Sequence, residues 1–213
     1  MTDGILAPTK SGLHGIQELK LEETMACVAV FLATGFEEIE AVTIIDVLRR
    51  ADVVVVTASL GELTVVGSHG IAIVADRSID DIDVLQFDAV VLPGGMPGST
   101  HLRDDERVRR AASLAAERGR IVAAICAAPI ALEAAGVLHG KNVTSYPGCE
   151  LPSAVRVDER VVEDETIITS CGPGSALEFA LTLARRLVGT AVAARVAQAM
   201  LVQGGDEPAT ARR

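Results

Sequence analysis

Aromatic residues are scarce in this chain, whose 213 residues include no tryptophan, one tyrosine and four phenylalanines. Hydrophobic residues nevertheless make up 49% of the sequence. The core must therefore be built from Val, Ala, Leu and Ile, which suits helices packed on a buried sheet. A chain of this length is sufficient for one sizeable domain with an extensive core.

Basic residues are not in excess either. The sequence has 19 Lys and Arg against 29 Asp and Glu, a formal net charge of −10. Because binding to a phosphate backbone requires a basic face, no nucleic-acid partner is expected. No apolar run reaches the roughly 18 residues of a membrane span, and the N-terminus lacks the pattern of a secretory signal. We therefore expect a cytoplasmic protein with no membrane partner.

Paired cysteine motifs are also missing. The four cysteines, Cys27, Cys126, Cys149 and Cys171, form no CxxC pair and no Cys/His spacing typical of a zinc site. Four scattered cysteines do not make a disulfide scaffold, which favours a reducing compartment. No bound metal is expected.

Short β-branched runs alternate with helical segments from residue 25 onward. The expected strands are 27–33, 53–59, 71–76, 88–95, 121–126 and 165–171, and the expected helices are 38–51, 104–119, 129–136, 175–189 and 191–201. This alternation is typical of an α/β fold with a mostly parallel sheet covered by helices on both faces. Within 63–76, the sequence Gly-Ser-His-Gly between two strands predicts a β-hairpin.

The two ends of the sequence differ from the rest. Residues 1–24 show no sustained periodicity and are interpreted as an N-terminal extension or an added segment. Residues 204–213 are polar and are expected to form a disordered tail. We therefore predict a single domain over residues 25–203.

Cys126 lies where an apolar strand is expected to end and a helix to begin. The first amides of a helix lack partners and carry partial positive charge, which favours a thiolate and predicts a lowered thiol pKa. Ala127 and Ala128 are small enough for a sharp turn, and Pro129 suits the first helical turn. The alternative is a buried structural cysteine, since free cysteines are often packed as small hydrophobic residues.

Two further segments end neighbouring strands, where ligands gather in open α/β sheets. Gly94 and Gly95 permit close backbone approach and leave amides available to an oxyanion, although by themselves they are better explained as a simple turn after a strand. In "GFEEIEAV", Glu40 lies one turn inside a helix beside apolar residues, where a carboxyl tends to be protonated. "GGMPG" does not match G-x-G-x-x-G, so no nicotinamide cofactor is expected.

Taken together and in this order, the motifs "GFEEIEAVTIIDVLRRA", "DAVVLPGGMPG", "IVAAICAAPIAL" and "TSCGPGSALEFAL" resemble the ThiJ/PfpI superfamily, in its DJ-one branch. The resemblance covers residues 26–202 and implies a flavodoxin-like three-layer sandwich and a homodimer. It implies that Cys126 is the reactive cysteine and that Glu40 is the buried acid bonded to it. It also implies that the amides of Gly95 and Ala127 line the site.

The resemblance further implies a cofactor-free glyoxalase III-like lyase or deglycase, which uses the cysteine on 2-oxoaldehydes such as methylglyoxal or on glycated substrates. The alternative it implies is a redox-sensing stress protein or chaperone, in which Cys126 oxidises to a sulfinate. A cysteine peptidase or amidase is disfavoured, because the peptidases of this superfamily have histidine directly after the cysteine and this chain has Ala127.

Three positions near the implied substrate pocket depart from the family pattern or remain open. Tyr146 stands where the human-type branch has histidine, and it either donates a hydrogen bond or shapes the pocket. His69 aligns with a basic residue that reaches the site from the partner subunit, but a turn residue is an equal alternative. Arg50 matches a basic residue near that dimer pocket or is a solvated helix end.

Cys149 and Cys171 are candidate resolving thiols for an oxidised Cys126.

Overall fold

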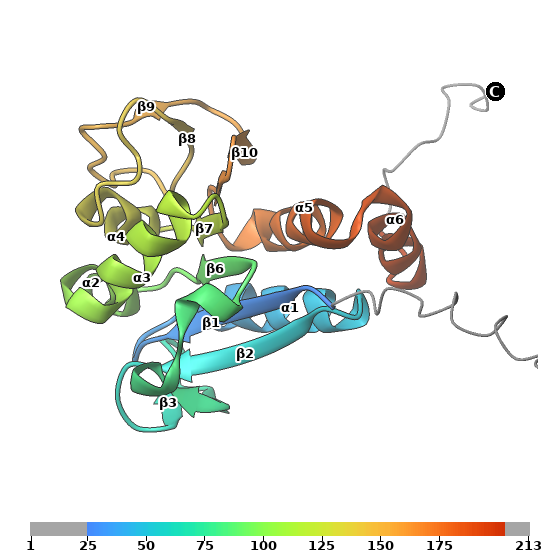
Figure 1. Ribbon diagram of the computed structural model, residues 1–213, viewed down its shortest axis with the longest axis horizontal. Coiled ribbons are helices and arrows are strands. Elements are labelled where there is room, and N and C mark those ends of the chain that lie inside the picture. Colours follow the sequence, from blue (N-terminus) through green and yellow to red (C-terminus); the bar gives the residue numbers. More distant parts are fainter. Residues whose placement is uncertain (1–24, 203–213) are drawn as a thin grey trace, which may run out of the picture.

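A seven-stranded sheet forms the centre of the molecule (Figure 1). The computed structural model describes residues 25–202. The strand order is β10-β11-β7-β6-β1-β2-β5, and every neighbouring pair is parallel except β10 and β11. The strands are β1 (Cys27–Leu32), β2 (Val54–Ser59), β5 (Arg77–Ser78), β6 (Ala89–Leu92), β7 (Ile121–Ile125), β10 (Val161–Asp164) and β11 (Ile167–Ser170).

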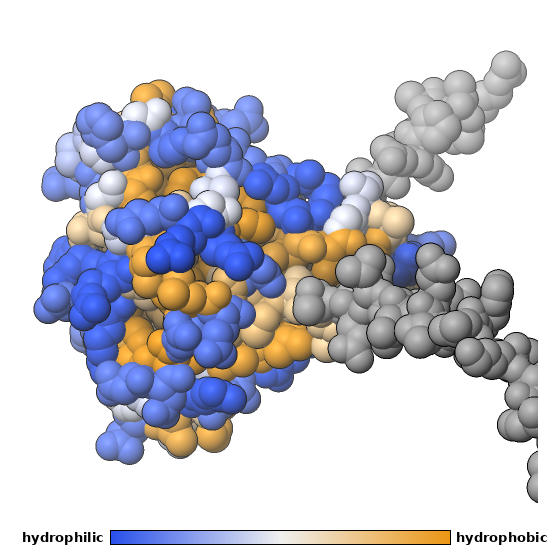
Figure 2. All heavy atoms as spheres, in the orientation of Figure 1, coloured by the Kyte–Doolittle hydropathy of each residue, from blue (hydrophilic) through white to orange (hydrophobic). Residues whose placement is uncertain are grey.

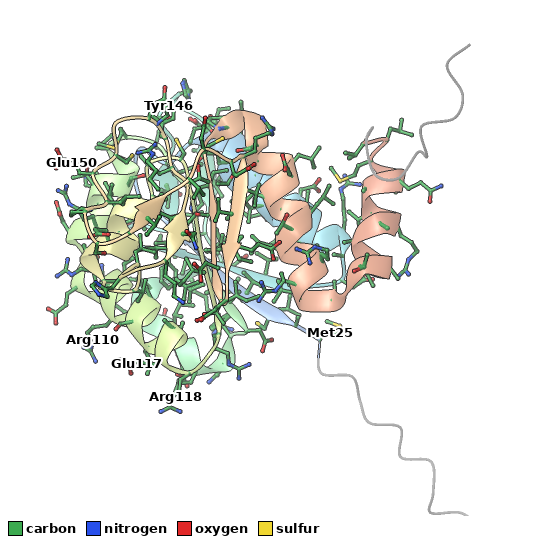
Figure 3. The ribbon with its side chains drawn as sticks, turned by 90° about the horizontal axis from the view of Figure 1, so that it is seen from above. Met25, Arg110, Glu117, Arg118, Tyr146 and Glu150 are labelled. Carbon is green, nitrogen blue, oxygen red and sulfur yellow. The ribbon has the colours of Figure 1, made fainter. Side chains whose placement is uncertain are left out.

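Helices cover both faces of this sheet, as Figures 1 and 3 show. They are α1 (Glu38–Arg50), α2 (Gly98–Asp104), α3 (Glu106–Glu117), α4 (Pro129–Ala134), α5 (Ala176–Val188) and α6 (Thr190–Ala199), with short 3-10 turns at Ile79–Asp81, Val84–Gln86 and Pro173–Ser175. Within residues 25–202, no helix combines the length and the hydropathy that crossing a membrane would require.

The core is divided by the sheet into two layers. Val28, Val30 and Leu32 of β1 pack toward α1, α5 and α6, whereas Ala29 and Phe31 pack toward α2, α3 and α4. This alternation follows from the two-residue period of a strand. Because both faces are buried, β6 and β7 are apolar along their whole length, which is the pattern expected of parallel strands.

Two small strand pairs lie outside the central sheet. β3 (Thr64–Val66) and β4 (Ala72–Val74) form the predicted antiparallel hairpin. The other pair is β8 (Asn142–Val143) and β9 (Val155–Arg156), which are parallel and enclose a long loop.

The structure adds elements that the sequence patterns did not predict. The helix predicted over 104–119 is α3 alone, and α2 precedes it as a separate helix, because Asp105 caps α3 with its side chain on the amide of Arg107. The antiparallel edge strand β10 was also not predicted. The proposed extension (1–24) and tail (204–213) lie outside the described residues.

Candidate active site

Three neighbouring parallel strands, β1, β6 and β7, end at the same edge of the sheet. The segment after β1 leads into α1 and supplies Glu40, the segment after β6 supplies Gly94 and Gly95, and the residue after β7 is Cys126. Because the carboxyl ends of parallel strands meet at one edge, these segments converge although they are far apart in the sequence. Among the residues predicted for the site, the structure therefore brings together Cys126, Glu40, Gly94, Gly95 and Ala127.

Cys126 occupies a left-handed turn between β7 and α4, with a φ of 61°. A residue with a Cβ rarely adopts this conformation, and two backbone hydrogen bonds hold it here. The amide of Cys126 donates to the carbonyl of Ser170 at 2.9 Å, and its carbonyl accepts from the amide of Tyr146 at 2.8 Å. The turn re-aims the side chain, since Ile125 and Cys126 pack in the same core layer although successive strand residues normally alternate.

Glu40 lies in the first turn of α1 and is fully buried. Its Oε2 accepts a hydrogen bond from the amide of Gly94 at 2.7 Å. Its Oε1 has no well-formed hydrogen bond within residues 25–202, although the thiol of Cys126 is near enough to lower the pKa of the carboxyl. Glu37 caps the helix by accepting from the amide of Glu40 at 2.7 Å, which fixes the start of α1 at this position.

Gly94 lies against both the carboxyl of Glu40 and the side chain of Cys126. A Cβ added there would lie 2.6 Å from Oε2 of Glu40 and 2.6 Å from Cβ of Cys126. Neither neighbour is a flexible chain end, because Oε2 is held by its hydrogen bond and Cys126 by its turn. Glycine at this position is therefore what allows a buried carboxyl and the cysteine to lie side by side.

Gly95 and Ala127 present backbone amides to the sulfur of Cys126, and both lower the pKa of the thiol. Gly95 has a φ of 93°, and a Cβ there would lie 2.3 Å from the amide nitrogen of Glu37. This close approach turns the segment after β6 toward Cys126. The two amides form a small anion-binding arrangement of the kind that stabilises a developing oxyanion.

Cys126 and Glu40 both become negative when they ionise, so each raises the cost of ionising the other. Burial raises the pKa of Glu40 to about 7, against the hydrogen bond from Gly94 and the interaction with Cys126. Burial and the Glu40 carboxylate raise the pKa of Cys126 to about 12, and the two amides do not offset them. The amide at the helix start does lower the thiol pKa, as the sequence predicts, but burial and Glu40 outweigh it, so the net shift is upward. Cys126 and Glu40 titrate as a coupled pair, in which ionisation of one group disfavours ionisation of the other.

Tyr146 lies in the loop between β8 and β9, on the outer side of the molecule in Figure 3. Its amide is bonded to Cys126, whereas its side chain is 52% exposed. The ring lies against Gly172, whose added Cβ would be 3.6 Å from Cδ2 of Tyr146. The side chain is thus placed at the rim between this loop and the segment after β11.

Arg156 was not singled out in the sequence, yet it holds this loop in place. Its guanidinium donates to the carbonyls of Ser145 at 2.9 Å, Tyr146 at 3.0 Å and Cys149 at 3.2 Å. No local pattern distinguishes this arginine from other surface arginines, because its partners are backbone carbonyls of an irregular loop.

His69 is bound to α1 within the same chain. Its amide donates to Oε1 of Glu38 at 2.6 Å, and its Nδ1 lies 2.8 Å from Oε2 of that carboxyl. Although burial acts against it, these bonds and one from the amide of Ile71 hold the pKa of Glu38 at about 2. The same partner raises the pKa of His69, whose side chain is 71% exposed. His69 thus anchors the hairpin to Glu38 and is not directed at Cys126 in a single chain.

Arg50 is not brought to the thiol. It lies at the opposite end of α1 from Glu40, roughly 15 Å further along the helix at 1.5 Å per residue. There its Nε donates to Asp46 at 2.7 Å, and it lines a groove with Val192 and Arg195 of α6. Within one chain Arg50 is therefore an ion-paired helix end, and its place near a pocket between two subunits stays a prediction.

Only one group of side chains among residues 25–202 offers three donors to a metal ion within 4.8 Å, namely Glu37, Glu38 and His69. Oxygen atoms of both carboxylates already accept hydrogen bonds, from Glu40 in one case and from His69 in the other. The arrangement is accounted for by helix capping and by the attachment of the hairpin.

A model described as the DJ-1/PfpI family matches residues 26–186 of this chain. The chain belongs to this family. Protein dj-1beta of Drosophila melanogaster is 42% identical over 179 residues, which is 81% of this chain and 95% of the fly protein. The crystal structure of that fly protein matches with a TM-score of 0.82 and 39% identity, over 84% of this chain and 100% of the other. The predicted flavodoxin-like α/β sandwich is thereby confirmed.

Two other members bear on the chemistry. Deglycase PH1704 of Pyrococcus horikoshii is 36% identical over 151 residues, which is 66% of this chain and 87% of that protein. A structure described as oxidized Toxoplasma gondii DJ-1 matches with a TM-score of 0.80 and 37% identity, over 84% of this chain and 100% of the other. This chain is thus similar to family members that are associated with deglycation and with oxidation.

Proposed function

We propose that this protein is a cofactor-free enzyme that acts on 2-oxoaldehydes such as methylglyoxal, as a glyoxalase III-like lyase, and on the related adducts of glycated substrates. The observation that carries this proposal is the buried Glu40 carboxyl beside Cys126, with a raised pKa and one oxygen free of well-formed hydrogen bonds within residues 25–202. A base with a pKa near 7 is well suited to proton transfer at neutral pH. The name of the relative Deglycase PH1704 supports the same class of substrate.

In the first step, the sulfur of Cys126 attacks the aldehyde carbon and forms a hemithioacetal. Glu40 takes the thiol proton on Oε1, since Oε2 is occupied by the amide of Gly94. The carbonyl oxygen becomes an oxyanion, which the amides of Gly95 and Ala127 stabilise until it receives a proton. The addition consumes one S–H bond and one C=O π bond and forms one S–C and one O–H bond.

In the second step, Glu40 moves a proton between neighbouring carbons. It removes the hydrogen of the hemithioacetal carbon, and the resulting enediol is reprotonated at the adjacent carbon to give a thioester of lactate. Water then cleaves this thioester, which releases lactate and restores the thiol. The net reaction adds one water to methylglyoxal and requires no oxidant or reductant.

The remaining pocket residues take supporting roles in this proposal. Gly94 keeps the acid and the thiol in contact, and the exposed ring of Tyr146 forms part of the rim. His69 and Arg50 belong to the pocket only if a second subunit completes it.

A homodimer is the proposed assembly. Exposed apolar side chains gather on α1 and the adjoining hairpin, namely Ile39, Val42, Val66, Ile71 and Val74, which are 42–69% exposed. Figure 2 shows apolar surface at the lower edge of the molecule, where the hairpin lies in Figure 1. Pairing this face with a second copy would remove it from water. Val42→Glu should convert a dimer to a monomer in light scattering, whereas Val155→Glu, at an equally exposed valine, should not.

Proton NMR of methylglyoxal with the purified protein and no glutathione tests the enzymatic proposal. The unmodified protein should produce lactate, and Cys126→Ala and Glu40→Ala should not. Cys27→Ala is the matched control, because Cys27 packs in the opposite core layer. Turnover that persists in Cys126→Ala, or no lactate from folded and reduced protein, would refute the mechanism.

A redox-sensing role is the second candidate, supported by the oxidized Toxoplasma relative. In this reading, peroxide converts Cys126 to a sulfinate whose oxygens are bonded by Glu40 and the two amides. If no second thiol captures the oxidised sulfur, mass analysis after excess peroxide should show two added oxygens on Cys126. A peptidase or amidase remains unsupported, because among residues 25–202 no histidine is bonded to the thiol.

A further inference from the structure

The loop between β8 and β9 places a second thiol, that of Cys149, near the backbone carbonyl of the reactive cysteine. The sulfur of Cys149 lies 4.0 Å from the carbonyl oxygen of Cys126. Two backbone hydrogen bonds link the same residues, from the amide of Tyr146 to Cys126 at 2.8 Å and from the amide of Cys149 to Tyr146 at 3.3 Å. The loop is therefore attached to the turn that carries the nucleophile.

Cys149 also lies on the correct side of the sheet. It is half-buried and packs against the core layer that contains Cys126. The other thiols are less favourably placed, since the sulfur of Cys171 lies 3.3 Å from Oγ of Ser175 and Cys27 packs in the opposite layer. Of the three, Cys149 has the contact that leads directly to Cys126.

We propose that Cys149 is a resolving thiol, which forms a reversible disulfide with Cys126 after a hydroperoxide has oxidised Cys126. In the first step, the sulfur of Cys126 attacks the peroxide oxygen, the O–O bond breaks, and the products are a sulfenic acid and water or an alcohol. In the second step, the sulfur of Cys149 attacks the sulfenic sulfur, an S–S bond forms, and water leaves. The peroxide is reduced by two electrons, and two thiols are oxidised to one disulfide.

Closure of the disulfide depends on movement of the loop that carries Cys149. A disulfide requires the sulfurs to approach to about 2.0 Å. Cys149 lies in an irregular segment rather than in a helix or strand, so its side chain can rotate and the loop can shift without breaking a sheet ladder. Arg156 is the positioning residue, because it bonds the carbonyl of Cys149 together with those of Ser145 and Tyr146.

The consequence concerns reversibility. Oxidation of Cys126 to a sulfinate is not reversed by dithiols, whereas a disulfide is. Capture by Cys149 would stop the oxidation at the sulfenic stage and preserve the thiol for another cycle. This inference rests on the reactivity of Cys126 toward peroxide and not on the turnover of methylglyoxal.

The test treats the reduced full chain with one equivalent of hydrogen peroxide, blocks free thiols by alkylation, and measures intact mass and non-reduced peptide maps. The four free thiols should fall to two, with a Cys126–Cys149 cross-linked peptide and no added oxygen. Dithiothreitol should restore all four. With excess peroxide, Cys149→Ser should instead add two oxygens to Cys126, and dithiothreitol should not remove this sulfinate. Cys171→Ser and Cys27→Ser should behave like the parent protein.

A further variant separates positioning from folding. Arg156→Gln should leave the rate of Cys126 oxidation unchanged and shift the product from disulfide toward added oxygen. Far-UV circular dichroism checks that each variant is folded, and Cys149→Ala replaces the serine variant if that one is not. A sulfinate at Cys126 with Cys149 still free in the parent protein would overturn the inference, as would a cross-link to Cys171. Because the readouts are mass and thiol number, absence of glyoxalase activity would refute the proposed function alone.

Discussion

The amide of Gly94 donates a 2.7 Å hydrogen bond to Oε2 of Glu40. This bond joins the segment after β6 to the first turn of α1, and it leaves the other oxygen of the carboxyl for the neighbouring thiol. The first turn of α1, the segment after β6 and the turn after β7 therefore meet at the carboxyl of Glu40. The proposed chemistry depends on this arrangement.

Gly94→Ala should abolish activity and destabilise the fold. The added methyl group would lie 2.6 Å from both Glu40 and Cys126, so one of them must move. Overpacking of this kind costs about 1–3 kcal/mol. Urea denaturation and the methylglyoxal assay measure the two effects. Gly61→Ala is the control, because a Cβ at Gly61 meets nothing within 4 Å. Equal stability of both variants would contradict the packing argument.

The rate should rise with pH through the pKa of Glu40. A general base acts in its ionised form, and the pKa of this carboxyl is about 7. Below pH 7, kcat/KM should therefore increase about tenfold per pH unit, and it should level off above that value. Stopped-flow or NMR rates between pH 5 and 9 provide the profile. A profile in the parent protein without an inflection near 7 would exclude Glu40 as the base.

Glu40 should also make the stability pH-dependent. Its pKa is raised from 4.5 to about 7 on folding, so the folded state holds the proton more tightly. The stabilisation is present below the unfolded pKa and is lost as pH rises toward 7, which amounts to roughly 3 kcal/mol. Relative to Glu40→Gln, the parent protein should become less stable from pH 5 to pH 8 in urea titrations. Parallel stability curves for the two proteins would argue against a buried protonated acid.

The stability of the β3–β4 hairpin should depend more on Glu38 than on His69. Glu38→Ala leaves the amides of His69 and Ile71 without their acceptor, whereas His69→Ala removes only an exposed ring. Loss of an exposed ion pair has little effect on stability, whereas hydrogen bonds from amides to a charged carboxylate contribute about 1.5–3 kcal/mol each. Hydrogen exchange in residues 64–74 should increase strongly in the first variant and slightly in the second. The reverse order would contradict the assigned roles.

Much of the fold and the position of the site could be predicted from the sequence, because both depend on local patterns. Apolar runs indicated the buried strands, and Cys126 and Glu40 follow strand ends that meet in a parallel sheet. The strand β10 escaped prediction because Val161–Asp164 is partly polar and pairs only at the sheet edge. The helix α2 is seven residues long and begins with Gly98, so it has little periodicity to detect.

The electrostatics of the site required the structure. A helix N-terminus lowers a thiol pKa, but the depth of burial of Cys126 and its contact with Glu40 act in the opposite direction and are larger. Neither quantity can be read from the sequence around Cys126. Arg156 shows the same limit, because its partners are carbonyls of a loop. The separation of Arg50 from Glu40, in contrast, follows from helix geometry alone.

The left-handed backbone of Cys126 has an evolutionary consequence. A residue with a Cβ in this conformation costs about 1–2 kcal/mol relative to one without. Glycine at this position would relieve that cost and remove the sulfur. A mutant library selected only for survival at high temperature should therefore enrich glycine at position 126, whereas one selected for aldehyde detoxification should retain cysteine.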